Sequence, residues 1–115
     1  MKILPSVAVL ASLAFGSVCG ACDVPDSAVQ IPDGSTATRE EMVAAQKAVV
    51  AYDAAVKTYS DCLQQEQEAK IAEGGDKAKL QAEYSKLNNV QVEKVQQLAD
   101  KFNAELKAYK AKSAG

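Results

Sequence analysis

The feature that most constrains the fold is a run of apolar side chains between Thr38 and Glu73 that recur in alternating steps of three and four residues. This spacing averages about 3.5 residues, which places the side chains in one stripe along an α-helix and is typical of a helix that packs along a single partner helix. The run therefore predicts a long helix with one contact stripe, which we call the seam. The seam residues expected in this helix are Met42, Ala45, Val49, Tyr52, Val56, Tyr59 and Leu63.

Both ends of this helix carry sequence signals. Thr38 is followed three residues later by Glu41, which predicts a capping box in which each side chain accepts a hydrogen bond from the other residue's backbone amide. At the other end, Gly74 favours the left-handed conformation that stops a helix, and Asp76 is a good N-cap for a new one. We therefore expect a helix over 38–73, a tight turn at 74–75 and a second helix over 76–112.

The second helix has an apolar seam of its own, in a less regular phase. Eleven residues separate Tyr84 from Val95, with Asn88 at a seam position between them, and this predicts a local loss of regular packing near Asn88. A polar residue in the seam would also help to fix the register of the two helices. The apolar seam residues expected in this helix are Leu80, Tyr84, Leu87, Val92, Val95, Ala99, Phe102, Leu106 and Tyr109.

The predicted fold class is all-α, because two helices joined by a two-residue turn form an antiparallel helical hairpin, or coiled coil, with arms ~54 Å long. The charges favour this pairing. Residues 22–75 carry ten acidic and four basic side chains, whereas residues 76–115 carry five acidic and eight basic ones. Exposed ion pairs each contribute well under ~1 kcal/mol, so we expect these charges to orient the arms more than to stabilise them.

Residues 1–21 have the composition of a signal peptide. Lys2 supplies a positive charge, residues 7–15 form a short apolar core, and the small residues of Cys19-Gly20-Ala21 precede Cys22. The apolar core is too short to anchor the chain across a bilayer. We expect cleavage before Cys22 and export to the periplasm or the exterior; a cut after Gly16 is an alternative that would retain Cys19.

The residues around this cleavage site also fit two other interpretations. A bacterial lipoprotein carries a lipidated Cys at its mature N-terminus, and Cys22 after Gly20-Ala21 fits that pattern, although Cys19 stands where such signals usually have Leu. Cys19 and Cys22 also form a C-x-x-C motif, the spacing of thiol oxidoreductases, but no βαβ pattern follows it. A simple cleavage site is the preferred interpretation, and lipid anchoring stays open.

Cys22 and Cys62 are then the two thiols of the exported chain, and in an oxidising compartment they are expected to form a disulfide. Cys62 would lie about 36 Å along the first helix, at 1.5 Å per residue. Residues 22–37, which we call the strap, can extend to roughly 50 Å and so can fold back along the helix to reach it. We therefore expect the strap to be extended and to pack on the helices.

The composition excludes several classes of chemistry. The chain has no His, which is the commonest metal ligand and the commonest general base at neutral pH. Its net charge of −2 and its pI near 5.1 disfavour nucleic-acid binding, which normally requires a basic surface. We expect no catalytic, cofactor-binding or metal site, and no enzymatic activity; a thiol enzyme is a distant alternative. The four tyrosines occur at seam spacing and are interpreted as core residues.

The first half of the chain contains a set of motifs at fixed spacing: Ile31-Pro32-Asp33-Gly34, Ala37-Thr38, Glu40-Glu41-Met42, Ala45-Gln46, Tyr52, Tyr59 and Cys62. In these motifs it resembles a family of short exported proteins of Gram-negative bacteria to which no function is assigned. The resemblance covers about Cys22 to Cys62, and it implies a helical body in the periplasm without supplying any catalytic residue. The second helix matches only as a generic coiled-coil helix.

Two functional classes fit these observations. The first is a non-catalytic interaction or structural module that presents the faces of a disulfide-linked hairpin to a protein partner or to another copy of itself. The second is a holdase-like chaperone, similar in arm shape to the trimeric coiled-coil chaperones of the periplasm. We prefer the first class, because the sequence shows no separate β-rich assembly domain and its basic charge is modest.

Overall fold

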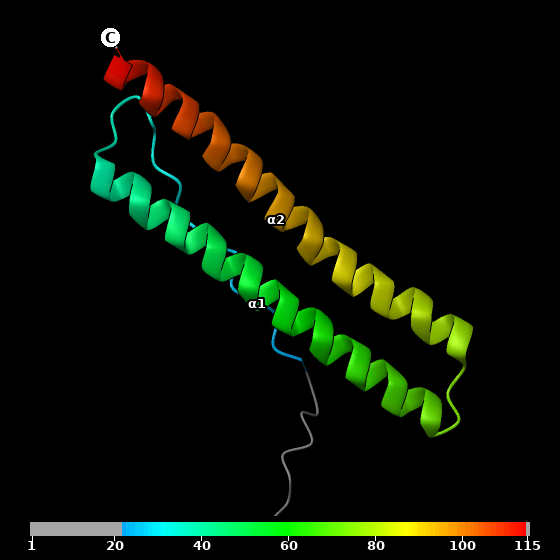
Figure 1. The fold of residues 1–115 in the computed structure, drawn as a ribbon. Coiled ribbons are helices and arrows are strands. Elements are labelled where there is room, and N and C mark those ends of the chain that lie inside the picture. The colour runs from blue at the N-terminus through cyan, green and yellow to red at the C-terminus, as the bar shows by residue number, and fades with distance from the viewer. Residues whose placement is uncertain (1–21, 115) are drawn as a thin grey trace, which may run out of the picture.

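A computed structural model of the chain describes residues 22–114; the predicted signal peptide over 1–21 and Gly115 lie outside the described residues. Two long helices, α1 (Arg39–Ala72) and α2 (Lys77–Ala114), lie side by side and are joined at one end by a short turn (Figure 1). No strand occurs among residues 22–114. The predicted all-α hairpin is confirmed, and the helices end within one or two residues of the expected positions.

The ends of the helices form as predicted. The Thr38 hydroxyl accepts from the Glu41 amide at 3.2 Å, and the Glu41 carboxylate accepts from the Thr38 amide at 3.0 Å, which confirms the capping box. Gly74 adopts a φ of 97° and its amide donates to the carbonyl of Ile71, so it stops α1 in the left-handed conformation. The Asp76 side chain accepts from the amide of Lys79 at 3.0 Å and caps α2.

The strap ends in a turn that docks on the C-terminal part of α2. The amide and the hydroxyl of Ser35 donate to the Asp33 carboxylate at 2.9 and 2.6 Å; these bonds, first of all that from the hydroxyl, hold the pKa of Asp33 below its usual value. Gly34 is buried, and its amide donates to the Glu105 carboxylate at 2.6 Å. The Lys112 ammonium donates to the carbonyl of Ala37, also at 2.6 Å. Backbone groups of the strap thus pair with side chains of α2.

The seam residues of α1 are more deeply buried than those of α2. Six of the residues predicted for it are buried, and Val49 is half-buried. No large side chain among residues 22–114 is buried completely, so the core is thin and the two helices by themselves cover little apolar surface. The buried seam residues of α1 are Met42, Ala45, Tyr52, Val56, Tyr59 and Leu63.

The seam of α2 differs from the prediction in its middle. Val92 was expected in the seam but is 49% exposed, and the preceding residue, Gln91, is buried at 4% exposure. Leu87, also expected there, is 48% exposed. Steps of four and three residues continue from Tyr84 through Asn88 and Gln91 to Val95, so the phase break that we predicted from apolar residues alone is wrong. Tyr84 is buried, and the other expected residues are half-buried: Leu80, Val95, Ala99, Phe102, Leu106 and Tyr109.

The contact between the strap and α2 predicts an effect of enlarging Gly34. A Cβ atom on this residue would lie 1.8 Å from the backbone oxygen of Glu105, a distance that requires the strap to move. We expect Gly34→Ala to lower the free energy of unfolding by about 1–3 kcal/mol, the usual cost of overpacking a close contact. Gln30→Ala, at an exposed strap position, is the matched control and should change it by less than about 0.5 kcal/mol. Equal urea midpoints for the two variants would contradict this docking.

Candidate interaction surface

The strap is joined covalently to α1 by the predicted disulfide between Cys22 and Cys62, whose Cα atoms are 5.7 Å apart. Cys22 packs against the core cluster of Tyr59, Leu63 and Tyr84, so the bond lies where the two helices meet. The two cysteines are separated by 40 residues, and closing a loop of this length lowers the entropy of the unfolded chain by the equivalent of about 4 kcal/mol in the chain-entropy model. The bond therefore contributes a large part of the free energy of unfolding that a protein with so thin a core can have.

From Cys22 the strap follows one face of the hairpin, which we call the strap face. Ser27, in the middle of the strap, shares a shallow depression with Lys94, Leu98 and Lys101 of α2. Farther along, Gly34 rests on Glu105 near the end of α2. In Figure 1 the strap passes alongside the two helices over this part of their length. One face of the hairpin is thus covered from the level of Cys62 to the start of α1.

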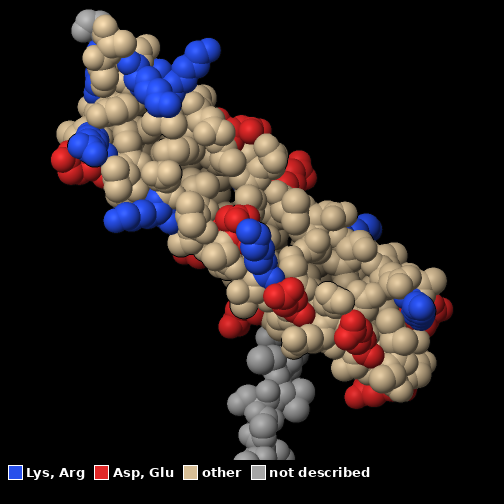
Figure 2. Space-filling model, viewed as in Figure 1, with Lys and Arg blue, Asp and Glu red and all other residues tan. Residues whose placement is uncertain are grey.

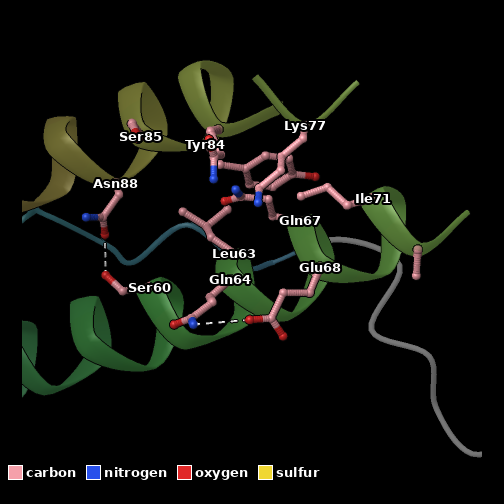
Figure 3. Close-up of a pocket in the computed structure, with 12 residues that line it drawn as sticks. Ser60, Leu63, Gln64, Gln67, Glu68, Ile71, Lys77, Tyr84, Ser85 and Asn88 are labelled. Atoms are coloured by element: carbon pink, nitrogen blue, oxygen red, sulfur yellow. Dashed lines mark hydrogen bonds between the residues drawn. The ribbon is translucent and has the colours of Figure 1, made fainter. Parts of the chain in front are cut away.

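The opposite side of the hairpin, which we call the open face, carries grooves that no strap residue lines. The larger one, of about 720 Å³, lies between the helices in the half near the turn. Figure 3 shows it with the strap passing behind Leu63, on the far side of the seam. Its walls are mainly hydroxyl and amide side chains, which suit hydrogen bonding to polypeptide rather than burial of a large apolar ligand. Residues lining it include Ser60, Gln64, Gln67, Gln81, Ser85 and Asn88.

The half of the open face away from the turn is more apolar. A smaller groove of about 150 Å³ is lined by Met42 and Val43 of α1 and by Phe102 and Leu106 of α2. Figure 2 shows mostly uncharged surface between the helices in this half, while blue and red side chains interrupt it near the middle of the molecule. Val50 and Val92 are 62% and 49% exposed, so the packing of the hairpin leaves both uncovered.

Two polar pairs cross the seam and fix the register of the helices. The Tyr52 hydroxyl donates to the side-chain oxygen of Gln91 at 2.7 Å, and burial raises the pKa of Tyr52 above its ordinary value. The Ser60 hydroxyl donates to the side-chain oxygen of Asn88, as Figure 3 shows. Because each bond requires one particular alignment of α1 and α2, a shift of either helix would leave buried polar groups without partners. The predicted role of Asn88 in the register is thus supported by a specific contact.

No ion pair among residues 22–114 links the two helices. The ion pairs among residues 22–114 are Asp53 with Lys57, at 3.0 Å, and Glu66 with Lys70, at 3.5 Å, and both lie within α1. The Lys70 ammonium also lies 5.3 Å from the centre of the Tyr84 ring. A hydrogen bond to Tyr84 is the main cause that raises the pKa of Lys70. The opposite net charges of the arms, which we expected to orient them, therefore form no ion pair between helices in the described part of the chain.

The described residues hold few groups with reactive chemistry. No cluster of three or more Cys, Asp or Glu side chains suited to a metal ion occurs among residues 22–114. A Glu66 carboxylate oxygen lies 3.4 Å from the sulfur of Cys22, which is bonded to Cys62 and therefore offers no free thiol. Neither helix of the described part carries an apolar stretch long enough to span a bilayer.

Some contacts of this surface were not predictable from the spacing of apolar residues. Gln91 was missed because a lone glutamine in a helix usually faces solvent, and only its pairing with Tyr52 makes its burial favourable. The close contact of Gly34 with the backbone of Glu105 in α2 was likewise not predictable, because it joins residues far apart in the sequence. The hydrogen bond from Lys112 to the carbonyl of Ala37 also joins distant parts of the sequence, so the spacing of apolar residues contains no signal for it.

Comparison with known proteins adds no relative: no family model, curated protein or solved structure matches this chain.

The buried pair of Tyr52 and Gln91 predicts a non-additive effect on stability. Gln91→Leu leaves the Tyr52 hydroxyl buried without a partner and should lower the free energy of unfolding by about 1–3 kcal/mol. Adding Tyr52→Phe removes the unpaired hydroxyl, so the double variant should be more stable than Gln91→Leu alone. Urea unfolding of the wild type, both single variants and the double variant measures this coupling. Strictly additive losses would show that the bond does not contribute.

Proposed function

We propose that this protein is an exported, non-catalytic interaction module, which uses the open face of a disulfide-linked helical hairpin to bind protein. Export by residues 1–21 with cleavage before Cys22 is part of the proposal, and the periplasm is the compartment that the sequence favours. The Cys22–Cys62 bond supports this location, because such bonds persist in oxidising compartments.

The observation that carries the proposal is the difference between the two faces. The strap covers one side of the hairpin by a covalent bond at one end and by hydrogen bonds to α2 at the other. The open face keeps a polar groove near the turn and exposed valines farther along. A fold that uses a separate segment to close one side, and leaves the other accessible, is suited to binding through the accessible side.

The composition of the open face indicates what it would bind. Its groove offers amide and hydroxyl groups that donate and accept hydrogen bonds, flanked by half-buried apolar side chains. A mixed surface of this kind resembles the contact region of protein partners that associate through helices, in which a few apolar residues are surrounded by polar ones. The partner is therefore expected to be a folded or helical protein segment rather than a small apolar ligand.

Site-specific photo-crosslinking of the protein expressed in a Gram-negative bacterium tests the proposal. A photoreactive residue in place of Gln64 or Ser85, on the open groove, should give adducts of defined mass in the periplasmic fraction. The same residue in place of Gln30, exposed on the strap, is the matched control and should give few. Intact mass of the uncrosslinked protein should show a chain that begins at Cys22 and lacks two hydrogens, as the disulfide requires.

Three results would contradict this function. Equal crosslinking at all three positions would show that the open face is not the binding surface, and retention of the protein in the cytoplasm would exclude the proposed location. Suppression of aggregation of an unfolded outer-membrane protein, without a defined adduct, would favour the holdase function instead.

A further inference from the structure

Each helix carries a stripe of exposed residues that recurs every seven positions on the side away from the seam. A spacing of seven residues is two turns of helix, so the members of a stripe lie in a line parallel to the helix axis. All ten residues are exposed. The stripe on α1 consists of Glu40, Lys47, Ala54, Asp61 and Glu68, and that on α2 of Lys79, Lys86, Glu93, Asp100 and Lys107.

The register of the hairpin shows that these two stripes are complementary. The contact of Ser60 with Asn88 and the packing of Leu63 with Tyr84 show which residues of the antiparallel helices lie at the same level: their residue numbers sum to 148 and 147, and those of the stripe pairs sum to 147. At four of the five levels an acidic residue of one stripe corresponds to a basic residue of the other, and at the fifth Ala54 corresponds to Glu93, so no level brings like charges together. The four oppositely charged levels are Glu40 with Lys107, Lys47 with Asp100, Asp61 with Lys86, and Glu68 with Lys79.

Within one hairpin the oppositely charged residues of the two stripes do not pair with each other. The stripes lie on opposite outer sides of the molecule, and neither described ion pair involves a residue of either stripe. Long side chains at matched levels can form ion pairs only where another α2 is placed alongside α1. The pattern therefore points to a second copy of the same chain, which carries the matching stripe in the matching register.

Building on the proposed binding role of the open face, we propose that this face binds a second copy of the chain about a two-fold axis parallel to the hairpin. In this arrangement α1 of each copy lies against α2 of the other, and the four helices form a bundle in which all neighbouring helices are antiparallel. The turns of both copies lie at the same end. The stripe on α1 of each copy then lies beside the stripe on α2 of the other copy, with the oppositely charged residues at the same level. The two-fold symmetry limits the assembly to two chains.

Apolar residues beside the stripes lie where this arrangement would cover them. Val43 lines the apolar groove of the open face, and Val50 follows it by seven residues on the same side of α1. Leu106 lines the same groove from α2, and Val92 precedes it by fourteen residues, again on the same side. The exposure of Val92 thus has an explanation: it is directed to the contact between copies, while Gln91 takes its place in the seam.

The net charges of the helices decide between the two possible symmetric arrangements. Helix α1 carries six acidic and four basic residues, whereas α2 carries four acidic and eight basic residues. A two-fold axis perpendicular to the hairpin would place α2 against α2 and bring two positive helices together. The parallel axis places each α1 against an α2 of opposite net charge, and so it is the arrangement that electrostatic complementarity favours.

Two charge-reversed variants test this inference with the full protein, purified with its disulfide intact. One carries Asp61→Lys and Glu68→Lys, and the other carries Lys79→Glu and Lys86→Glu. Each variant alone would place like charges at both contacts between copies and should raise the dimer dissociation constant at least tenfold. An equimolar mixture restores opposite charges at both contacts, so it should form a mixed dimer with an affinity near that of the wild type.

Light scattering after size-exclusion chromatography measures the mass, with circular dichroism to show that both variants stay helical. The expected masses are two chains for the wild type and for the mixture, and one chain for each variant alone at the same concentration. A wild type of one chain, variants that dimerise as the wild type does, or a mass that grows beyond two chains would each overturn the inference. A single-chain protein that still crosslinks to a different protein through Gln64 would overturn this inference and leave the proposed function standing.

Discussion

The disulfide between Cys22 and Cys62 is the interaction on which the rest of the structure depends. Two helices packed along one seam bury little apolar surface, and no large side chain among residues 22–114 is fully buried. The bond holds the strap against Tyr59, Leu63 and Tyr84, the cluster where the helices meet. The bond thereby adds the strap as a third layer to a fold whose two helices alone would be exposed on both faces. It also lowers the conformational entropy of the unfolded chain by closing a long loop.

The strap also makes the two faces of the hairpin different. Its far end pairs with Glu105 and Lys112 of α2, so it crosses from one helix to the other along a single face. The buried pair of Tyr52 and Gln91 fixes the alignment of the helices beneath it. Because this alignment also sets the levels of the outer charged residues, the same register that stabilises the hairpin defines the charge pattern along its two outer sides. The covered strap face, the register and the accessible open face are thus consequences of one arrangement.

Much of this fold could be predicted from the sequence, because its main signals are local. Steps of three and four residues located α1, the capping box of Thr38 and Glu41 located its start, and Gly74 located its end. The middle of α2 could not be predicted, since apolar spacing favoured Val92 for the seam. A polar residue is buried only where another helix supplies its hydrogen-bond partner, and the periodicity of a single helix contains no information about that partner.

Hydrogen exchange of the oxidised and the reduced protein tests most directly whether the disulfide holds the strap in place. If it does, reduction should increase amide exchange first in residues 55–66 of α1 and 80–88 of α2, which surround Tyr59, Leu63 and Tyr84. The part of α2 around Glu105, where hydrogen bonds hold the other end of the strap, should keep more of its protection. Identical exchange before and after reduction would contradict this account, because it would show that the hairpin keeps its core without the covalent bond.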